Sequence, residues 1–334
     1  MAAERIALVK LSALGDVVHT LPVAAALRAA KPSSRVAWIV ERREAALLRG
    51  HPALDAVIEV DTRAWRRARG PAAVLAALRA LLALRRRLRA ERFDVALDAQ
   101  GLLKSGVIAA ATGAPTRIGF GRGWSRERAS GLFTTLKVSP PPEAVHVVDQ
   151  YLALLEPLGI RHPAVTFTLP ADAGAEARMD AALAAAGLKP RDRLVVINPG
   201  AGRRAKQWPV ARFHELARRL AREHGAAVLV VWGPREYDEA QAIAGDDVAL
   251  APPTDLLELI AVLRRASVVV AGDTGPLHLA AALGVPCVGL YGPTSARRNG
   301  PYGAGHRTLQ SADGTMSGIA TASVTGAVAA LLAA

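Results

Sequence analysis

The chain has 334 residues, of which 51% are hydrophobic and only 4% aromatic, and its formal net charge is +13. The apolar fraction excludes an intrinsically disordered chain, and the length predicts about two domains, each with its own core. A single cysteine, Cys287, excludes a disulfide framework and any zinc site built from several cysteines. We therefore expect a reduced, cytosolic globular protein.

The positive charge indicates an anionic partner. Nucleic acid, a membrane surface and a phosphorylated substrate all satisfy it, and composition does not choose among them. Alanine and arginine are both abundant, which a GC-rich genome also produces, so part of the charge is open to that explanation. The segments that follow the predicted strands must therefore identify the partner.

Short β-branched runs alternate with Ala- and Leu-rich helical stretches along most of the chain. The first series has predicted strands at 6–9, 36–40, 56–60 and 95–97, with helices at 16–30, 72–90 and 143–158. After a helix at 173–187, the second series has strands at 194–197, 227–231, 268–270 and 287–290, with helices at 210–224, 255–265 and 277–283. This alternation is typical of parallel sheets covered by helices on both faces.

The predicted fold is therefore α/β, with two Rossmann-like, doubly wound domains that face a cleft. We place the N-terminal domain at 1–165, a linker region at 166–190 and the C-terminal domain at 191–312. The segment 313–334 is predicted to be a C-terminal helix, with packing back on the N-terminal domain as one option. Its small residues argue against a membrane span, and the N-terminus has no signal-peptide pattern.

The first informative loop follows the first predicted strand and carries Gly15 and Asp16. Gly15 permits a tight turn, and Asp16 lies near a predicted helix N-terminus, where an aspartate commonly acts as the N-cap. The alternative is a carboxylate at the domain cleft that serves as a general base. Shielding there would raise the pKa of Asp16 and suit it to proton abstraction near neutral pH.

The second loop, 198–209, combines glycines with basic residues. Gly200 and Gly202 resemble a dinucleotide-binding pattern, but that pattern requires the glycines to open a helix directly. Pro209 instead predicts a helix start after Trp208. A basic, Gly-rich loop that carries Lys206 is better suited to neutralising phosphates as a leaving group departs.

Two further loops follow predicted strands of the second series. Glu236 has the position of an acidic residue that binds a ribose, or it is one of the acids common at helix N-termini. The string Asp273–His278 starts a helix at Pro276, so its free N–H groups form an anion site. An ordinary Gly-Pro helix start with a packed histidine is the alternative interpretation.

Several catalytic signatures are missing from the sequence. It has no P-loop, no Gly-x-Ser-x-Gly elbow, no His-Glu-x-x-His string and no Asp-x-Asp pair. These absences argue against a P-loop NTPase, an α/β-hydrolase, a zinc hydrolase and a metal-dependent transferase. A nucleic-acid-binding protein is a remote alternative, because no basic face is interleaved with aromatic residues.

Six motifs together resemble the lipopolysaccharide heptosyltransferases, a glycosyltransferase family of the GT-B fold, and are most similar to the heptosyltransferase I group. They are Lys10–Pro22 (KLSALGDVVHTLP), Asp98–Ser105 (DAQGLLKS), Lys206–Pro209 (KQWP), Trp232–Glu236 (WGPRE), Asp273–His278 (DTGPLH) and Tyr291–Thr294 (YGPT). The resemblance implies inverting, metal-independent transfer of L-glycero-D-manno-heptose from ADP-heptose to the Kdo region of lipid A, with no cofactor. Another nucleotide sugar or a different inner-core acceptor is the alternative.

The resemblance also implies roles for individual residues. Asp16 would be the general base, and Lys206 would stabilise the departing ADP phosphates. Residues implied to bind the donor are Gly15, Gly200, Gly202, Glu236, Asp273, Thr274, Gly275 and His278. Residues implied to face the acceptor are Arg63, Arg66, Arg67 and Arg126. The implied location is cytoplasmic and peripheral to the inner membrane, with Kdo-lipid A as partner and no nucleic acid.

Overall fold

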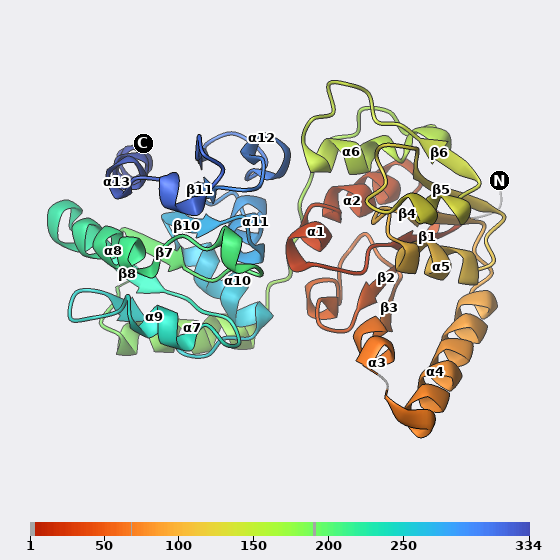
Figure 1. Ribbon diagram of the computed structural model, residues 1–334, viewed down its shortest axis with the longest axis horizontal. Coiled ribbons are helices and arrows are strands. Elements are labelled where there is room, and N and C mark those ends of the chain that lie inside the picture. Colours follow the sequence, from red (N-terminus) through yellow and green to blue (C-terminus); the bar gives the residue numbers. More distant parts are fainter. Residues whose placement is uncertain (1–3, 68, 190–191) are drawn as a thin grey trace. The chain divides into compact units, whose positions relative to one another are not determined.

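The computed structural model describes residues 4–67, 69–189 and 192–334, without the side chain of Arg66. The chain divides into two compact units, Met1–Thr168 and Leu169–Ala334. Each unit contains one six-stranded parallel sheet with helices packed against it (Figure 1). The prediction of two doubly wound α/β domains is confirmed.

The sheet of the first unit has the order β3-β2-β1-β4-β5-β6, and every pairing is parallel. Its strands are β1 (Arg5–Val9), β2 (Arg35–Glu41), β3 (Ala56–Val60), β4 (Val95–Asp98), β5 (Thr116–Phe120) and β6 (Leu136–Val138). The inner strands are nearly continuous apolar runs because both faces of the sheet are covered. The strand order reverses between β1 and β4, which is where such sheets bind ligands.

The predicted helices of the first unit all occur, one of them divided in two, and the helices at 62–67 and 103–111 were not predicted. The observed helices are α1 (Leu14–Val18), α2 (Leu21–Ala30), α3 (Thr62–Arg67), α4 (Gly70–Ala90), α5 (Leu103–Ala111) and α6 (Val147–Ala153), with 3-10 turns η1 (Ala45–Leu47), η2 (Arg128–Leu132) and η3 (Glu156–Leu158). The single helix predicted at 16–30 is two, α1 and α2. Pro22 lies in the first turn of α2, where its missing N–H costs no hydrogen bond.

The second unit repeats the topology of the first. Its sheet has the order β12-β11-β10-β7-β8-β9, again all parallel, so the order reverses between β7 and β10. The strands are β7 (Leu194–Asn198), β8 (Ala227–Val230), β9 (Ala249–Leu250), β10 (Val268–Gly272), β11 (Cys287–Tyr291) and β12 (Arg307–Gln310). The edge strands β9 and β12 were not predicted, because one has two residues and the other is mostly exposed.

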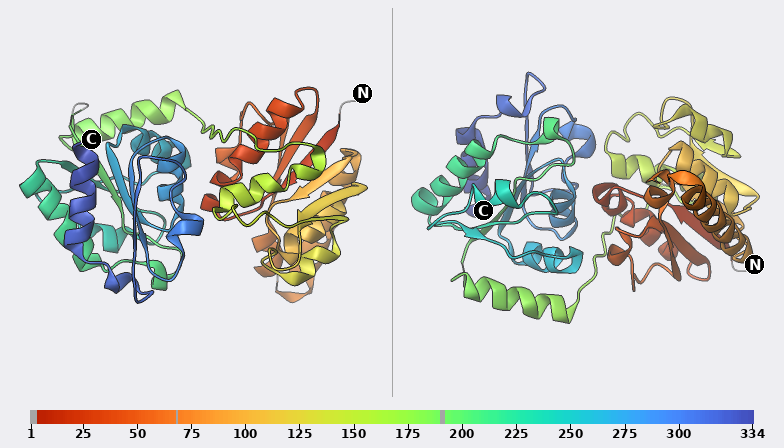
Figure 2. Two further views of the ribbon diagram at one scale, coloured as in Figure 1. Left: turned by 90° about the horizontal axis from the view of Figure 1, so that it is seen from above. Right: turned by 60° about the horizontal axis from the view of Figure 1, so that its bottom comes forward.

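The helices of the second unit lie on both faces of this sheet (Figure 2). They are α7 (Ala173–Ala185), α8 (Val210–His224), α9 (Tyr237–Gln241), α10 (Leu256–Arg265), α11 (Gly275–Ala282), α12 (Ala296–Asn299) and α13 (Thr321–Leu332), with η4 (Arg204–Lys206) and η5 (Met316–Gly318). Among the residues that the structure describes, no helix combines the length and the apolar character of a membrane span.

Two segments at the ends of this unit pack against its own helices. The predicted linker 166–190 contains α7, which packs on α10 and is held there by ion pairs of Glu176 with Arg264 and Arg265. The C-terminal helix α13 packs on α8, and Val324 and Val328 are fully buried in the core of the second unit. Its apolar stripe is therefore part of that core.

Candidate functional site

Both sheets carry polar side chains where their strand order reverses. In the first unit, Asp16 lies in the helix that follows the loop after β1, and Gln100 lies in the loop after β4. In the second unit, the loops after β7 and β10 carry Lys206 and Asp273. Each pair lies at the carboxyl ends of neighbouring parallel strands, which is the ligand-binding edge of a doubly wound sheet.

Asp16 is the centre of the first cluster. It is the third residue of α1, whose N-cap is Ala13, so it is not itself the N-cap. Arg126 donates two hydrogen bonds to its carboxylate, from Nη2 to Oδ1 at 2.5 Å and from Nη1 to Oδ2 at 3.0 Å. The Tyr151 hydroxyl donates to Oδ1 at 3.0 Å. The carboxylate is thus held by side chains from two separate parts of the unit.

Lys10 supplies a second cation at this carboxylate. Its side chain is fully buried, and Nζ lies 3.7 Å from Asp16 Oδ1 and 3.8 Å from the centre of the Tyr151 ring. Nζ also donates to the Ala99 carbonyl at 2.9 Å. Burial alone would raise the pKa of Asp16, but Lys10 and Arg126 outweigh it and hold that pKa well below its usual range. The raised pKa expected for Asp16 is therefore wrong, and the carboxylate is ionised at neutral pH.

Gln100 holds the loop that leads from β1 to Asp16 in α1. Its Oε1 accepts from the Leu11 N–H at 2.7 Å, and its Nε2 donates to the Ser12 carbonyl at 2.6 Å. Asp98 holds the turn below it by accepting from the N–H groups of Gln100 and Gly101. This stretch is one of the motifs of the family resemblance, which implies no role for its residues. The structure shows that it braces the loop after β1.

The arginines expected to face the acceptor divide into two groups. Arg126 lies on Asp16, as described. Arg63 and Arg67 are exposed on α3, which begins two residues after β3 ends and so lies at the carboxyl edge of the same sheet. The side chain of Arg66, on the same helix, is outside the described part of the chain.

The second cluster joins Lys206, Asp273 and His278. Lys206 Nζ donates to Asp273 Oδ2 at 2.6 Å, and His278 Nε2 lies 3.2 Å from Oδ1. Burial raises the pKa of Asp273, but its hydrogen bonds to His278 and Lys206 outweigh this and hold that pKa well below its usual range. Beside it, β7 ends at the buried Asn198, whose Oδ1 has no hydrogen-bond partner within the described ranges.

The helix start beside Asp273 leaves its amide groups open. Thr274 is the N-cap of α11, but its side chain makes no capping bond to the first turn. Its hydroxyl donates instead to the Gly272 carbonyl at 3.2 Å. The N–H groups of a helix N-terminus that carries no side-chain cap favour an anionic ligand. Gly275, the first residue of α11, contributes one of them.

Glu236 is placed by the glycines of two loops. Its Oε2 accepts from the Gly233 N–H at 2.9 Å. A Cβ added at Gly200 would lie 2.0 Å from that same oxygen, so only glycine leaves room for the carboxylate. A Cβ added at Gly202 would meet no atom within 4 Å. Of the two glycines in the loop after β7, Gly200 therefore serves the placement of Glu236.

The described residues contain no group of three or more His, Cys, Asp or Glu side chains able to hold a metal ion.

The model of glycosyltransferase family 9 (heptosyltransferase) matches residues 81–323, well over half of the chain. The chain belongs to this family. It is a glycosyltransferase, and its two doubly wound units are of the GT-B type.

Individual relatives of this glycosyltransferase agree with the family assignment. Lipopolysaccharide heptosyltransferase 1 of Pseudomonas aeruginosa is 34% identical over 302 residues, which cover 90% of this chain and 81% of the relative. The structure of Escherichia coli heptosyltransferase WaaC with ADP is 29% identical, with a TM-score of 0.81 over 98% of this chain and 99% of that one. The same enzyme with ADP-2-deoxy-2-fluoro heptose is 28% identical, with a TM-score of 0.76 over 97% of this chain and 98% of that one.

The two clusters give this glycosyltransferase different chemical capacities. The ionised Asp16 is a proton acceptor whose negative charge is paired with Arg126 and Lys10. Lys206 and the first turn of α11 offer positive charge to a phosphate. Proton acceptance and leaving-group stabilisation are the two requirements of a displacement at a sugar carbon.

Proposed function

We propose that this glycosyltransferase transfers L-glycero-D-manno-heptose from ADP-heptose to the Kdo region of the lipid A inner core, with inversion and without a metal ion. Its relatives named lipopolysaccharide heptosyltransferase 1 and the WaaC structure with a fluorinated ADP-heptose support heptose transfer in inner-core synthesis. The observation that carries the proposal is the cluster of Lys206, Asp273 and His278 at the uncapped start of α11.

The second unit binds the donor in this proposal. The diphosphate occupies the N-terminus of α11, where Thr274 and Gly275 present backbone N–H groups. Lys206 then gives up its contact with Asp273 and binds the phosphate. Asp273 and His278 are thereby free to bind the sugar hydroxyls. Glu236, placed against Gly200, accepts hydrogen bonds from the nucleoside.

The first unit binds the acceptor. The Kdo region carries carboxylates, which compete with Asp16 for the guanidinium of Arg126. Arg126 is two-fifths exposed and is therefore accessible to such an anion, whereas Lys10 is fully buried and stays in place. Once Arg126 turns to the acceptor, Asp16 loses its strongest hydrogen bonds. The pKa of Asp16 then rises, and the carboxylate becomes a better base at the moment that the acceptor hydroxyl arrives.

The chemical step balances with the residues already named. Asp16 takes the proton of the acceptor hydroxyl, and the hydroxyl oxygen forms a bond to the anomeric carbon of the heptose. The bond from that carbon to the phosphate oxygen breaks, and ADP leaves with the electron pair. Lys206 and the N–H groups of α11 stabilise the charge that develops on the departing phosphate. Attack opposite the leaving group inverts the anomeric configuration.

The acceptor also sets the place of action. A lipid A derivative is anchored in a bilayer by its acyl chains, so the enzyme must reach the cytoplasmic face of the inner membrane. We place it there as a peripheral protein, on the basis of its charge of +13 and its lipid-linked acceptor. The outward-facing positive charge is thereby assigned to an anionic glycolipid and its membrane rather than to nucleic acid.

Donor competition tests the proposal. Purified enzyme is given a Kdo-bearing lipid A acceptor and equal concentrations of ADP-heptose, a UDP-sugar and a GDP-sugar, and products are resolved by mass spectrometry. Heptose is expected to be the sugar transferred, in the presence of EDTA as well. Equal turnover of the UDP- or GDP-sugar would replace the proposal with another nucleotide-sugar transferase. Transfer of heptose to a different inner-core sugar would keep the donor and change the acceptor.

A further inference from the structure

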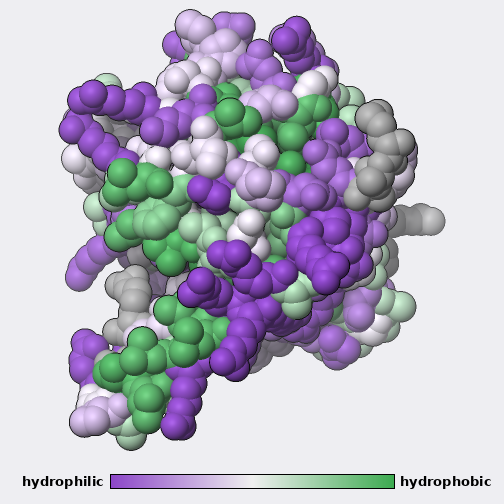
Figure 3. All heavy atoms as spheres, turned by 90° about the vertical axis from the view of Figure 1, so that its right-hand side faces the viewer, coloured by the Kyte–Doolittle hydropathy of each residue, from purple (hydrophilic) through white to green (hydrophobic). Residues whose placement is uncertain are grey.

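The helix α4 exposes an apolar stripe along its first half. Val74, Leu75, Leu78 and Leu82 have 46%, 48%, 52% and 53% of their surface exposed. Their spacing places them on one face of the helix. The last two turns are anchored instead, because Leu84 and Leu88 pack into the core of the first unit. Figure 3 shows apolar side chains gathered at the lower end of the molecule, with hydrophilic ones on either side.

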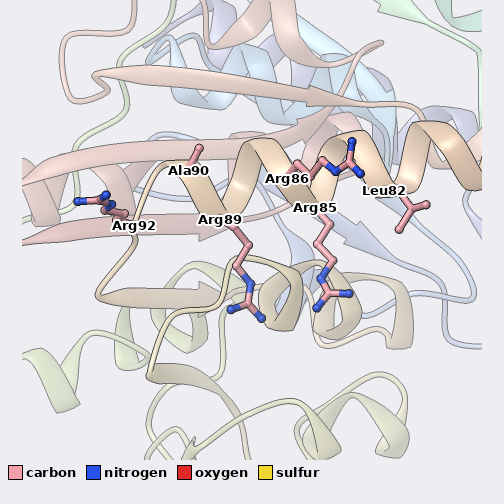
Figure 4. A pocket seen from close by; sticks show the side chains of 6 residues that line it. All are labelled: Leu82, Arg85, Arg86, Arg89, Ala90 and Arg92. Atoms are coloured by element: carbon pink, nitrogen blue, oxygen red, sulfur yellow. The ribbon is translucent and has the colours of Figure 1, made fainter.

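The same face becomes strongly basic toward the end of α4. Arg85 and Arg89 follow Leu82 by three and seven positions, and Figure 4 shows both extending to one side of the helix. An open hollow of about 650 Å³ lies there, lined by Leu82, Arg85, Arg86, Arg89, Ala90 and Arg92. The sequence of α4 has arginine at 79, 85, 86, 87 and 89, and it has no aspartate or glutamate.

We propose that α4 is the membrane-docking element of this enzyme and that it lies in the surface of an anionic lipid bilayer. The leucines enter the boundary between headgroups and acyl chains, and the arginines bind the lipid phosphates. The first half of the helix carries a single charge, Arg79, while the second half carries four arginines. That gradient fits a helix whose apolar end enters the bilayer while its basic end remains among the headgroups.

Charge decides against the other occupants of this face. A second copy of the chain would bring the same arginines against one another, without an acidic residue on α4 to pair with them. A nucleic acid would satisfy the arginines but not the leucines, because its bases stack on aromatic rings and this stripe is aliphatic. An anionic bilayer satisfies both halves of the helix. Exposed apolar stripes of this kind are uncommon on proteins that bind nothing there.

The inference rests on the proposed function for its purpose, since a lipid-linked acceptor requires an enzyme that reaches the bilayer. It adds the element that makes the contact and the lipid chemistry that α4 recognises. It also separates two sets of arginines on the first unit. Those of α4 bind bulk anionic lipid, whereas Arg126 serves the acceptor.

Vesicle flotation with the full chain tests the inference. One set of vesicles contains phosphatidylcholine alone, and the other contains phosphatidylcholine and phosphatidylglycerol in equal parts. The wild type is expected to float with the anionic set and to lose that binding as salt is raised. The variant Leu75→Gln/Leu78→Gln/Leu82→Gln should bind about tenfold more weakly, because its half-exposed leucines no longer leave water. Leu132→Gln, at a residue that is 81% exposed outside α4, is the control and should bind as the wild type.

A charge variant tests the basic half. Arg85→Gln should weaken binding to the anionic vesicles by about fivefold at low salt, because one arginine near an anionic surface contributes that order of attraction. Arg218→Gln, at an exposed position of α8, is its control and should change little. Arg89 is left intact because it packs on Gly113, where an added Cβ would lie 2.7 Å from its side chain.

Transfer to a soluble, deacylated acceptor separates this inference from the proposed function. The leucine variant should keep wild-type transfer and wild-type circular dichroism while it loses vesicle binding. Wild-type flotation by that variant would overturn the docking role of α4. Loss of a solution dimer in the variant would identify a second copy as the occupant, and loss of duplex DNA binding would identify nucleic acid. Absence of heptose transfer by the wild type would overturn the proposed function and leave the flotation result unaffected.

Discussion

Arg126 holds Asp16 through two hydrogen bonds across 110 positions of the chain. The sequence comparison placed these residues in different roles, one facing the acceptor and the other acting as base. Their contact joins those roles, because the guanidinium that an acceptor anion would attract is the group that keeps the pKa of the base low. Acceptor binding and activation of the base therefore become one event in the proposed mechanism.

Replacement of Arg126 tests this link through the pH profile. Arg126→Gln removes one of the cations that hold the pKa of Asp16 below its ordinary value, so that pKa rises. A base must be deprotonated to act, so the acidic limb of kcat/KM should move to higher pH. The acceptor KM should also rise by about tenfold, the usual order for loss of one charged contact.

The control for this experiment is Arg122→Gln, at an exposed position of the same loop. It should leave both the acidic limb and the acceptor KM unchanged. An Arg126→Gln enzyme whose acidic limb stays at the wild-type pH would show that Arg126 does not set the pKa of Asp16.

Asp16→Asn should abolish transfer, with a loss of about a hundredfold or more in kcat, since the amide accepts no proton. Binding of ADP, measured by calorimetry, should stay within a few-fold because the donor residues lie in the second unit. The variant should also unfold at a lower temperature, since the buried Lys10 loses the carboxylate that lies 3.7 Å from its Nζ. Near-native turnover would reduce Asp16 to a structural partner of Arg126.

The stability that the Asp16 ion pair contributes to the fold depends on pH in a definite direction. Its folded pKa is depressed, so its contribution to stability is fully present above the ordinary aspartate pKa. That contribution is lost as the pH falls through the folded value. The difference in Tm between wild type and Asp16→Asn should accordingly be largest near neutral pH and shrink in strong acid.

Lys206→Ala should lower kcat and weaken donor binding together. The lysine is proposed to meet the phosphate in the ground state and more strongly as charge develops on the leaving group, so both parameters depend on it. We expect a loss in kcat of about a hundredfold and a weaker ADP affinity, measured by initial rates and calorimetry. An unchanged rate would remove Lys206 from the leaving-group role and leave it as the partner of Asp273.

Gly200 and Gly202 form a matched pair for the placement of Glu236. Gly200→Ala would bring a Cβ to 2.0 Å from Glu236 Oε2, so the carboxylate must move and the donor KM should rise by about tenfold. Gly202→Ala meets open space and should leave the donor KM unchanged. Equal effects of the two substitutions would show that the loop itself, rather than Glu236, governs donor affinity.

The sequence by itself determined the two doubly wound units, because buried parallel strands are local apolar runs and their helices begin and end at local breaks. The helix α8 was predicted at its observed bounds, 210–224. The motifs also located the loops at which ligands bind. The edge strands β6, β9 and β12 were missed because their pairing depends on neighbours rather than on composition, and the inner strand β5 was missed as well.

Only the tertiary structure decided how the polar groups pair. Lys10, Gln100 and Tyr151 received no role from the sequence, and the raised pKa expected for Asp16 was wrong. Burial alone would have raised that pKa, but the two cations that the fold places beside the carboxylate reverse the direction of the shift. Coulomb energy falls with distance and depends on the surrounding dielectric, so it is set by which side chains the fold brings together and not by their order along the chain.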